Sequence, residues 1–310
     1  MKFTNIKSNK FKLAEVNMAK IVVIGSCNID VTVECDRFAH PGETLFGNKL
    51  NLYPGGKGAN QAVAAARLGA EVTMVGCIGD DMYGEMMLKT LKDNNIDCSC
   101  LEILPGENTG TAHITVAEDD NTIYVVKAAN DKVEPKHVDA ALAKIQAADM
   151  VMLQHEIPFA TIHYAIAKCA ELGVPVLLNP APVAPVPEEV LAKVNYLTPN
   201  EHEAAILFAG KSTEEILLSN QGKVIMTLGS KGVAYGADDA VVNVPAFKVK
   251  PLDTTGAGDT FNGAFAVAKA NGLELAEAIR FGNAAAALSV QRKGAQGGMP
   301  YLKEVEEMLK

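Results

Sequence analysis

The chain has 310 residues, of which 48% are hydrophobic and 21% are charged, and its formal net charge is −9. This length and composition predict a well-packed protein with one large α/β domain, or a main domain with a smaller appendage. The negative charge argues against a nucleic acid or an anionic membrane as a partner, because basic surfaces bind both. A small anionic ligand needs only local positive potential, so the net charge excludes no such substrate.

The six cysteines form no C-x-x-C pair and no zinc-like cluster with histidine, and most lie in apolar runs. We therefore expect reduced, buried thiols and a cytoplasmic protein. Residues 1–18 contain several lysines but no continuous apolar stretch, so they resemble neither a secretory signal nor a membrane span. We expect them to be a disordered extension ahead of the first strand.

From residue 19 onward, short apolar runs alternate with longer amphipathic segments, which is typical of βαβ units around a mainly parallel sheet flanked by helices. Apolar runs without alternation fit strands that helices cover on both faces. The predicted buried strands are residues 21–25, 72–78, 150–153, 174–178 and 224–228. The predicted helices are residues 60–68, 84–94, 135–147, 161–172, 260–270 and 275–290.

Two regions differ from this pattern. The first is residues 29–35, and the second comprises residues 112–116 and 122–126. In both regions apolar and polar side chains alternate. Alternation with a period of two indicates a sheet with one covered and one open face. These strands predict either a small antiparallel β lid inserted into the core or ordinary edge strands, and periodicity alone does not decide between them.

The segment from Asp253 to Phe265 reads DTTGAGDTFNGAF and combines small flexible residues with the start of an apolar helical pattern. Its glycines allow backbone N–H groups to converge at a helix N-terminus, which attracts phosphate. The N–H groups around Gly256, Ala257 and Gly258 could form an anion hole for a transferring phosphoryl group. Asp259 could accept the proton of an attacking hydroxyl. Read alone, the same segment also fits a capped helix whose first-turn aspartate complements the dipole.

A second glycine-rich segment, GGKGAN at residues 55–60, precedes an alanine-rich helix and offers polar contacts from Lys57 and Asn60. It is neither a Walker A loop nor a dinucleotide fingerprint, so close helix–sheet packing explains it as well as ligand binding does. Further polar side chains follow predicted strands, where ligands bind in open α/β sheets. They are Asn28, Asp30, Glu156, Asn200 and Glu203.

An Asn-x-x-Glu step such as Asn200–Glu203 could hold Mg²⁺ directly or through water, although each residue could equally cap a helix. The sequence lacks H-E-x-x-H, which a zinc protease of that type needs, and G-x-S-x-G, which marks the nucleophile of serine hydrolases. Neither function is therefore expected. An NAD-dependent dehydrogenase is disfavoured for the same kind of reason, because its Gly-rich fingerprint is missing after the first strand.

Together these segments resemble the PfkB-type carbohydrate kinase family, whose two signatures occur here in order. The first runs from Gly55 through Gly69 to Gly79, and the second is residues 253–265. The resemblance extends from about residue 20 to residue 309, and the residues between the signatures are most similar to members that act on ribose. It implies a Rossmann-like kinase core of residues 19–30, 56–107 and 128–310, with a β lid of residues 31–55 and 108–127.

The resemblance implies ATP-dependent phosphorylation of D-ribose at O5, with Asp259 as general base and Gly256–Gly258 as the anion hole. ATP, Mg²⁺ and an activating K⁺ are the implied cofactors, and a homodimer through the β lid is the implied assembly. The implied sugar contacts are Asn28, Asp30, Gly56, Lys57, Asn60, Glu156 and Asp259. The implied nucleotide contacts are Asn200, Thr227, Gly229, Gly232, Gly258 and Asn283. The implied K⁺ site comprises Asp253, Thr255, Ser289, Arg292, Gly294 and Gly298.

The sequence departs from the family pattern at two places. Gly298 stands where the family often has serine, so one K⁺ ligand would be a backbone or water oxygen. The stretch between Asn200 and Thr227 is shorter than usual, and we expect part of a helix around residues 211–222 to be lost. The open alternatives are a kinase for another sugar or nucleoside, such as deoxyribose or fructose, and a non-catalytic sugar-binding sensor.

Overall fold

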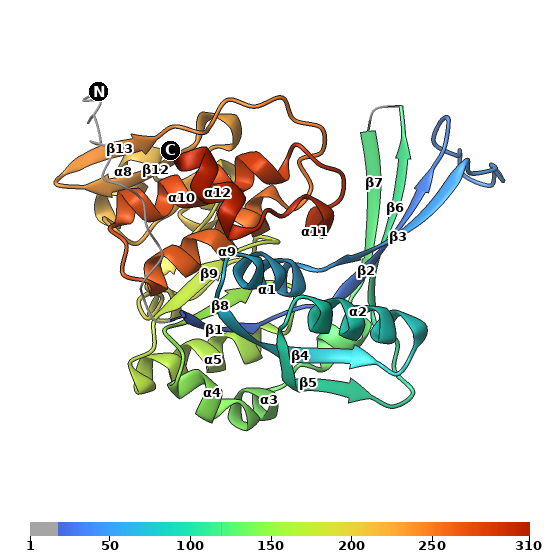
Figure 1. Ribbon diagram of the computed structural model, residues 1–310, viewed down its shortest axis with the longest axis horizontal. Helices are drawn as coiled ribbons and strands as arrows, with labels where there is room; N and C mark the ends of the chain where they lie inside the picture. The colour runs from blue at the N-terminus through green and yellow to red at the C-terminus, as the bar shows by residue number, and fades with distance from the viewer. Residues whose placement is uncertain (1–17, 119) are drawn as a thin grey trace.

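The fold is described from a computed structural model that defines residues 18–118 and 120–310 (Figure 1). A central sheet of six parallel strands has the order β10-β9-β8-β1-β4-β5. Its strands are β1 (Lys20–Ile24), β4 (Glu71–Gly79), β5 (Asp97–Leu104), β8 (Met150–Gln154), β9 (Val176–Asn179) and β10 (Tyr196–Leu197). The mainly parallel sheet predicted from the sequence is confirmed.

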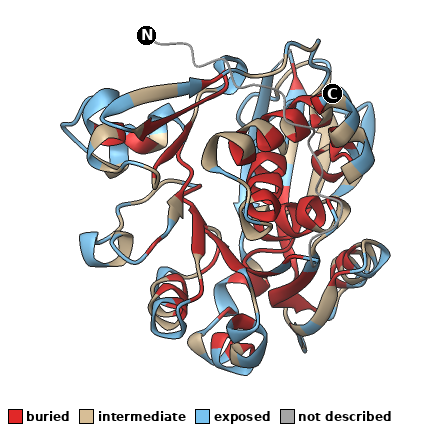
Figure 2. Cartoon of the chain, turned by 60° about the vertical axis from the view of Figure 1, so that its left-hand side comes forward, coloured by how far each residue is buried: buried red, intermediate tan, exposed pale blue. Residues whose placement is uncertain are grey.

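Helices cover both faces of this sheet, and the side chains of β1 show why. Ile21 and Val23 pack into one apolar core, whereas Val22 and Ile24 pack into the other, since successive strand side chains point to opposite faces. In Figure 2 the buried residues concentrate in the central strands and in the helix surfaces that face them. A strand buried on both faces must be apolar throughout, which is the pattern of residues 21–24.

The first face is covered by α1 (Lys57–Arg67), α2 (Met82–Asp93), α9 (Ala257–Ala270), α10 (Leu275–Ser289) and α12 (Leu302–Leu309), with the short α11 (Ala295–Gly298) beside α1 and α10. The second face is covered by α3 (Pro135–Ala140), α4 (Leu142–Gln146) and α5 (Phe159–Leu172), which lie below the sheet in Figure 1. The single helix predicted over residues 135–147 is thus divided in two, with Ala141 between them.

The sheet continues beyond β10 into a smaller antiparallel sheet of β11 (Ile225–Thr227), β12 (Val233–Ala237) and β13 (Ala240–Val244). Parallel bridges from Leu197 to Val224 and from Asn200 to Thr227 join the two sheets. The segment between them forms α7 (Glu201–Leu207) and α8 (Thr213–Ser219), and α6 (Glu188–Leu191) precedes β10. The predicted loss of part of a helix in this segment stays a prediction.

The two alternating regions form one separate sheet, which we call the lid, with the strand order β3-β2-β6-β7 (Figure 1). Its strands are β2 (Asn28–Glu34), β3 (Lys49–Gly55), β6 (Gly110–Ala117) and β7 (Asp120–Val126). The outer pairs are antiparallel, but β2 and β6 pair in parallel, which the alternation did not indicate. The lid projects from one side of the core.

The N-terminal extension predicted for residues 1–18 lies outside the described residues except for Met18, which is exposed. Within the described part of the chain, no helix combines the length and the apolar character needed to cross a membrane.

Candidate active site

The candidate site lies where the carboxyl ends of the central strands meet the N-termini of α1 and α9 and the base of the lid. Asn28 begins β2 soon after β1, Glu156 follows β8, and Asn200 follows β10. Parallel strands bring these ends to one edge of the sheet, as expected for an open α/β fold. The sequence therefore placed the strand-end side chains on the correct edge.

Asp259 is the third residue of α9 and is only 8% exposed. Its carboxylate accepts a hydrogen bond from Asn60 Nδ2 at 2.9 Å and another from Gln61 Nε2 at 3.0 Å. These two donors from α1 fix the orientation of the carboxylate. A buried, oriented carboxylate at a helix N-terminus is suited to accept a proton from a hydroxyl.

The turn before Asp259 is built on Gly256, which adopts the left-handed conformation with φ of 74° and caps α9. A Cβ on Gly256 would approach the Cβ of Ala295 to 2.8 Å, whereas a Cβ on Gly258 would meet no atom within 4 Å. The Gly258 side of the turn therefore faces open space. The N–H of Ala257 donates to the Thr254 carbonyl at 3.2 Å, so this group must exchange that partner if it is to bind an anion.

Glu156 acts as a backbone clamp in this structure. Its Oε2 accepts hydrogen bonds from the Ser26 hydroxyl at 2.6 Å and from the Lys57 backbone N–H at 2.9 Å. The Ser26 hydroxyl in turn accepts from the Gly58 N–H at 3.2 Å. Glu156 thus fixes the first turn of α1 against the end of β1, and its second oxygen is left for a substrate.

The side chain of Lys57 is the positive centre of the site. Burial opposes its charge, but the combined attraction of surrounding carboxylates raises its pKa. Those carboxylates are Asp259, Glu156, Glu203 and Asp30. Lys57 therefore stays protonated, and its charge interacts with carboxylates across the site, from Asp30 to Glu203.

Asp30 has the most perturbed carboxyl group of the site. Burial, followed by repulsion from Glu156 and Asp259, raises its pKa from 3.8 to about 7, although Lys57 opposes the shift. The carboxylate lies against Gly55, where an added Cβ would be 2.5 Å from both of its oxygens. A carboxyl group with this pKa changes its hydrogen-bonding capacity near neutral pH.

Asn28 is buried and held by a residue outside the predicted set, Asn130 of the 3₁₀ turn η1 (Ala128–Lys132). Asn130 Nδ2 donates to Asn28 Oδ1 at 2.7 Å, and Asn130 Oδ1 accepts from the Cys27 N–H at 2.8 Å. The oxygen of Asn28 is therefore occupied, and its Nδ2 is the group left to donate to a ligand. Gly56 lies against this strand, since an added Cβ would approach the Asn28 nitrogen to 2.7 Å.

The residues predicted to contact a nucleotide lie just after β10, at the end of β11, at the turn that follows β11, and on α9 and α10. Asn200 bridges to Thr227, whose N–H donates to the Pro199 carbonyl at 2.9 Å. Gly229 and Gly232 flank the turn η2 (Gly229–Lys231), both with positive φ. Asn283 of α10 donates from Nδ2 to the Val244 and Pro245 carbonyls at 3.1 and 3.2 Å, so it fixes the loop after β13.

Asn200 and Glu203, the predicted Mg²⁺ residues, form the capping box of α7. The Asn200 N–H donates to Glu203 Oε2 and the Glu203 N–H donates to Asn200 Oδ1, both at 2.8 Å. The helix-capping role that the sequence left open for these two residues is thus present. Burial raises the pKa of Glu203, and a divalent cation held through water would favour its ionised form.

The residues of the predicted K⁺ site come from two loops that hydrogen bonds hold together. Asp253 accepts from the Thr255 N–H at 2.9 Å and from the Gly294 N–H at 2.7 Å. Burial raises the pKa of Asp253, but these hydrogen bonds outweigh it and the net shift is downward. The ionised carboxylate and nearby carbonyls are oxygen donors of the kind that K⁺ requires, so the residues fit such an ion.

The other half of this set surrounds the Ser289 carbonyl, which accepts from the Arg292 N–H at 3.3 Å. A Cβ on Gly298 would lie 2.4 Å from that carbonyl oxygen, so glycine fits where the family often has serine. The guanidinium of Arg292 pairs with Glu304. Arg292 can therefore contribute to a cation site only through its backbone.

Sequence reasoning missed the residues that support the site from behind. Gln296 Nε2 donates to Asn60 Oδ1 at 3.0 Å, and Gln154 Nε2 donates to Gln61 Oε1 at 2.8 Å. With Gln61, Ser26 and Asn130, they orient the side chains that face the ligand. Gln61 lies within the first signature, which runs from Gly55 through Gly69, whereas nothing local marks Asn130.

The comparisons with known proteins agree with this geometry. Residues 18–302 match the profile of the pfkB family carbohydrate kinases. A ribokinase of Bacillus subtilis is 50% identical over 292 residues, which cover 94% of this chain and 100% of that protein. A ribokinase of Lactococcus lactis is 45% identical, with 94% of this chain and 98% of that protein covered.

Solved structures give the same result. The ribokinase of Arabidopsis thaliana complexed with ribose and ATP is 35% identical, with a TM-score of 0.88, and covers 95% of this chain and 99% of its own. The ribokinase of Thermotoga maritima is 37% identical, with a TM-score of 0.85, and covers 94% of this chain and 99% of its own. The fold and the order of the site segments are therefore shared along the whole described chain.

Proposed function

Because the chain belongs to the pfkB family of carbohydrate kinases, we propose that it transfers the γ-phosphoryl group of ATP to O5 of D-ribose. The products are ribose 5-phosphate and ADP. The observation that carries the proposal is the buried Asp259 carboxylate, fixed by Asn60 and Gln61 beside the glycine turn of α9. The ribokinases at 50% and 45% identity support ribose as the acceptor.

The sugar occupies the space between α1, α9 and the base of the lid. Asn28 donates through Nδ2, while Asp30, Asn60 and Glu156 supply acceptors for ring hydroxyls, and Gly56 allows close approach of the backbone. Lys57 supplies positive charge that balances the surrounding carboxylates. With the sugar bound in this way, one of its hydroxyls would lie next to Asp259.

In the reaction, Asp259 accepts the proton of O5 while O5 forms its bond to the γ-phosphorus. The bond from that phosphorus to the bridging oxygen breaks, and ADP leaves with the electron pair. The N–H groups of Gly256, Ala257 and Gly258 stabilise the negative charge of the transferring group. The nucleotide lies along Asn200, Thr227, Gly229, Gly232, Gly258 and Asn283.

The lid excludes water when it closes over the sugar. Tyr53, Asp30, Ala112 and Val125 are register partners across β3, β2, β6 and β7, so they share one face of the lid. Because Asp30 is a proposed sugar contact, the face of the lid that carries it would point toward the sugar. Its apolar members would cover the sugar, and an excluded-water site limits hydrolysis of ATP.

Two metal ions belong to the proposal. Asn200 and Glu203 would hold Mg²⁺ through water, and the ion would neutralise phosphate charge. Asp253, Thr255, Ser289, Arg292, Gly294 and Gly298 would hold K⁺, which would stabilise the turn that precedes Asp259.

We also propose a homodimer formed through the lid. Every residue of β7 is exposed, including Ile123, Tyr124, Val125 and Val126, which are 51–71% exposed. An apolar edge strand of this kind is normally covered by a partner. Light scattering at micromolar concentration would give twice the monomer mass, and Ile123→Lys would shift the protein toward the monomer.

The free thiols of all six cysteines support a reducing, cytoplasmic location. Cys27, Cys77 and Cys169 are buried, and burial raises the pKa values of their thiols.

The test is ADP release with Mg²⁺ and K⁺ across ribose, deoxyribose, fructose, adenosine and keto-deoxygluconate. We expect by far the highest kcat/KM with ribose. A preference for deoxyribose, the substrate named for a 34% identical deoxyribokinase of Salmonella typhimurium, would keep the kinase and change the acceptor. If no sugar caused ADP release while calorimetry still detected ribose binding, the protein would be a sugar-binding sensor.

The matched variants are Asp259→Asn and Asp139→Asn. Asp139 is an exposed carboxylate of α3 that accepts from the Tyr164 hydroxyl, far from the site in sequence and structure. Asp259→Asn should bind ribose but lose about 10²–10⁴-fold in kcat, the usual contribution of a general base. Near-normal turnover in Asp259→Asn would remove Asp259 from the mechanism.

A further inference from the structure

Three side chains with metal-binding chemistry meet between the sheet and α3, outside the candidate active site. Cys77 of β4 and Glu102 of β5 are register partners, so their side chains project from the same face of the sheet. α3 contacts this part of the sheet and brings His137 between them. One ligand atom from each residue lies within 4.8 Å of the other two.

We propose that Cys77, Glu102 and His137 bind a divalent transition-metal ion of the Zn²⁺ class, with water as the fourth ligand. Thiolate, imidazole and carboxylate are the three ligand types that Zn²⁺ takes in proteins. Three protein ligands with one open position form a tetrahedral site. Nothing in the kinase mechanism uses this cluster.

The ligand spacing suits such an ion. Two ligand atoms on a tetrahedral zinc lie about 3.3–3.6 Å apart, as follows from the usual bond lengths. The Cys77 sulfur is 3.3 Å from His137 Nε2, which in turn is 2.6 Å from Glu102 Oε2. Metal binding therefore requires the His137–Glu102 contact to lengthen by about 0.7 Å, with the Cys77 sulfur and the Glu102 oxygen, now within 4.8 Å, at the same tetrahedral spacing.

The other nitrogen of His137 has partners for both tautomers. Nδ1 can accept from the Glu134 N–H at 2.8 Å or donate to the Glu134 carbonyl at 3.0 Å. In the second tautomer Nε2 presents its lone pair toward Cys77 and Glu102. An imidazole whose far N–H donates to a backbone carbonyl is the usual arrangement of a metal-ligating histidine.

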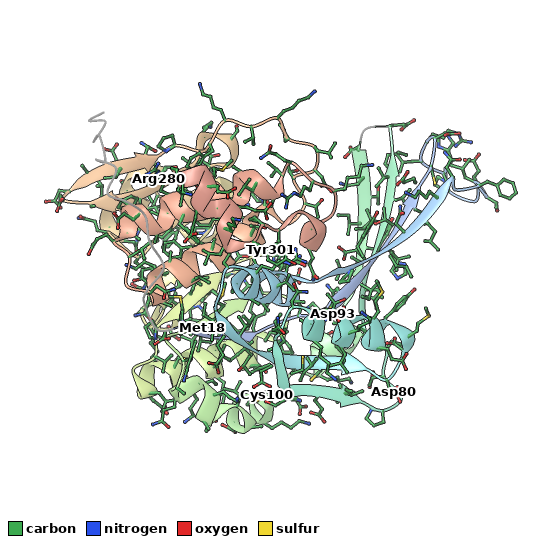
Figure 3. The ribbon with its side chains drawn as sticks, in the orientation of Figure 1. Met18, Asp80, Asp93, Cys100, Arg280 and Tyr301 are labelled. Carbon is green, nitrogen blue, oxygen red and sulfur yellow. The ribbon has the colours of Figure 1, made fainter. Side chains whose placement is uncertain are left out.

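Burial and charge around the cluster are also suitable. Cys77 and His137 are buried, whereas the Glu102 side chain is 45% exposed, so an ion can reach the cluster from the Glu102 side. The cation of Lys136, which would oppose a metal ion, is itself paired with Glu134 at 3.1 Å. In Figure 3 the labelled Cys100 marks this strand, β5, at the lower edge of the molecule, on the opposite side of the sheet from the labelled Tyr301.

Binding converts the thiol into a metal thiolate, and the thiol proton leaves to solvent. An ordinary cysteine thiol without a metal ion holds its proton at neutral pH. Each metal ion bound should therefore release about one proton. The affinity should fall as the pH is lowered.

The experiment is a Co²⁺ titration of the full-length, chelator-treated protein, followed by absorbance. We expect a saturable thiolate-to-cobalt charge-transfer band at one Co²⁺ per chain, with displacement by Zn²⁺ and release of about one proton in weakly buffered solution. Cys77→Ser should abolish the band, whereas Cys100→Ser should leave it unchanged, because Cys100 lies on the same strand but outside the cluster.

Glu102→Gln serves as a second variant, since its side chain is half-exposed and its loss leaves the core intact. It should weaken Co²⁺ binding about tenfold or more, because a neutral amide replaces an anionic ligand. The proposal is wrong if the wild-type protein shows no saturable band. A band of equal strength in Cys77→Ser would likewise overturn it, since the metal would then be bound elsewhere.

Discussion

Asn130 and Asn28 form a buried amide pair, in which Asn130 Nδ2 donates to Asn28 Oδ1 at 2.7 Å. Asn130 follows the last lid strand, whereas Asn28 begins the first, so the pair connects both ends of the lid at its base. In the proposed function the pair would also determine which atom of Asn28 faces the sugar. Lid position and sugar recognition would then be coupled through one hydrogen bond.

Replacing Asn130 with alanine should raise the KM for ribose about tenfold, the effect of losing one hydrogen bond to an oriented polar group, and should leave the KM for ATP nearly unchanged. Steady-state kinetics with each substrate varied in turn measures this split. Asn220→Ala is the matched control, because Asn220 donates only to backbone and hydroxyl groups at the end of α8. Equal effects on both KM values would indicate a general structural role instead.

Gln61→Leu should lower kcat about tenfold while ribose binding changes little. Gln61 donates to Asp259 at 3.0 Å and carries no group toward the sugar in the proposed arrangement, so its loss misorients the base. Single-turnover kinetics together with calorimetric ribose binding separates the two effects. The control is Gln221→Leu, a surface amide that contacts Asp239. A loss of ribose affinity equal to the loss of kcat would contradict the positioning role.

Ribose binding to the nucleotide-free protein should weaken below pH 7. Because the pKa of Asp30 is raised to about 7, the carboxylate becomes protonated below that pH and loses acceptor capacity. The association constant should fall about tenfold per pH unit once the pH is well below 7. Calorimetry between pH 5.5 and about 8.5 tests this, and Asp30→Asn should show weaker, pH-independent binding. An unchanged pH profile in that variant would assign the titration to another group.

The same pKa shift affects the stability of the unliganded protein. The folded state holds the Asp30 proton more tightly than the unfolded state, whose carboxyl has the ordinary value of 3.8. The contribution of Asp30 to the free energy of unfolding is therefore fully present below about pH 4 and is lost as the pH rises through about 7. Denaturant melts of wild type and Asp30→Asn should converge at low pH, separate as the pH rises from about 4 to about 7, and stay apart above it, with the variant the more stable. Parallel curves would contradict the shift.

Two pairs of glycine variants test the turn and the cation loop. Gly256→Ala should lower both the Tm and kcat, because φ of 74° disfavours alanine and the new Cβ would contact Ala295. Gly258→Ala should fold normally and weaken ATP use alone, since its Cβ points into open space where the phosphates would lie. Thermal melts and ATP kinetics distinguish these outcomes. Equal Tm losses in both variants would contradict the assignment.

Gly298→Ala should reduce K⁺ activation, because its Cβ would collide with the Ser289 carbonyl. Gly297→Ala is the matched neighbour, since a Cβ there meets nothing within 4 Å. The measurement is kcat with and without K⁺ at constant ionic strength. The proposed cation site would be wrong if K⁺ activated both variants as it does the wild type, or failed to activate the wild type.

The sequence alone determined the parts of this protein that depend on local pattern. Continuous apolar runs such as residues 21–24 favour a sheet covered on both faces, and glycines before an apolar helix allow a turn that can hold an anion. The two glycine-rich segments and Asp259 were singled out this way as candidates, and so were the strand-end residues, because parallel strands end at one edge.

The tertiary structure decided which side chains meet. Gln61 and Asp259 are 198 residues apart, and Asn28 and Asn130 are 102 apart, so no periodicity relates them. The parallel pairing of β2 with β6 likewise depends on packing between distant segments. Hydrogen bonds and charge interactions act over a few ångströms in space and are indifferent to distance along the chain. The polar network behind the base could therefore be identified only once the chain was folded.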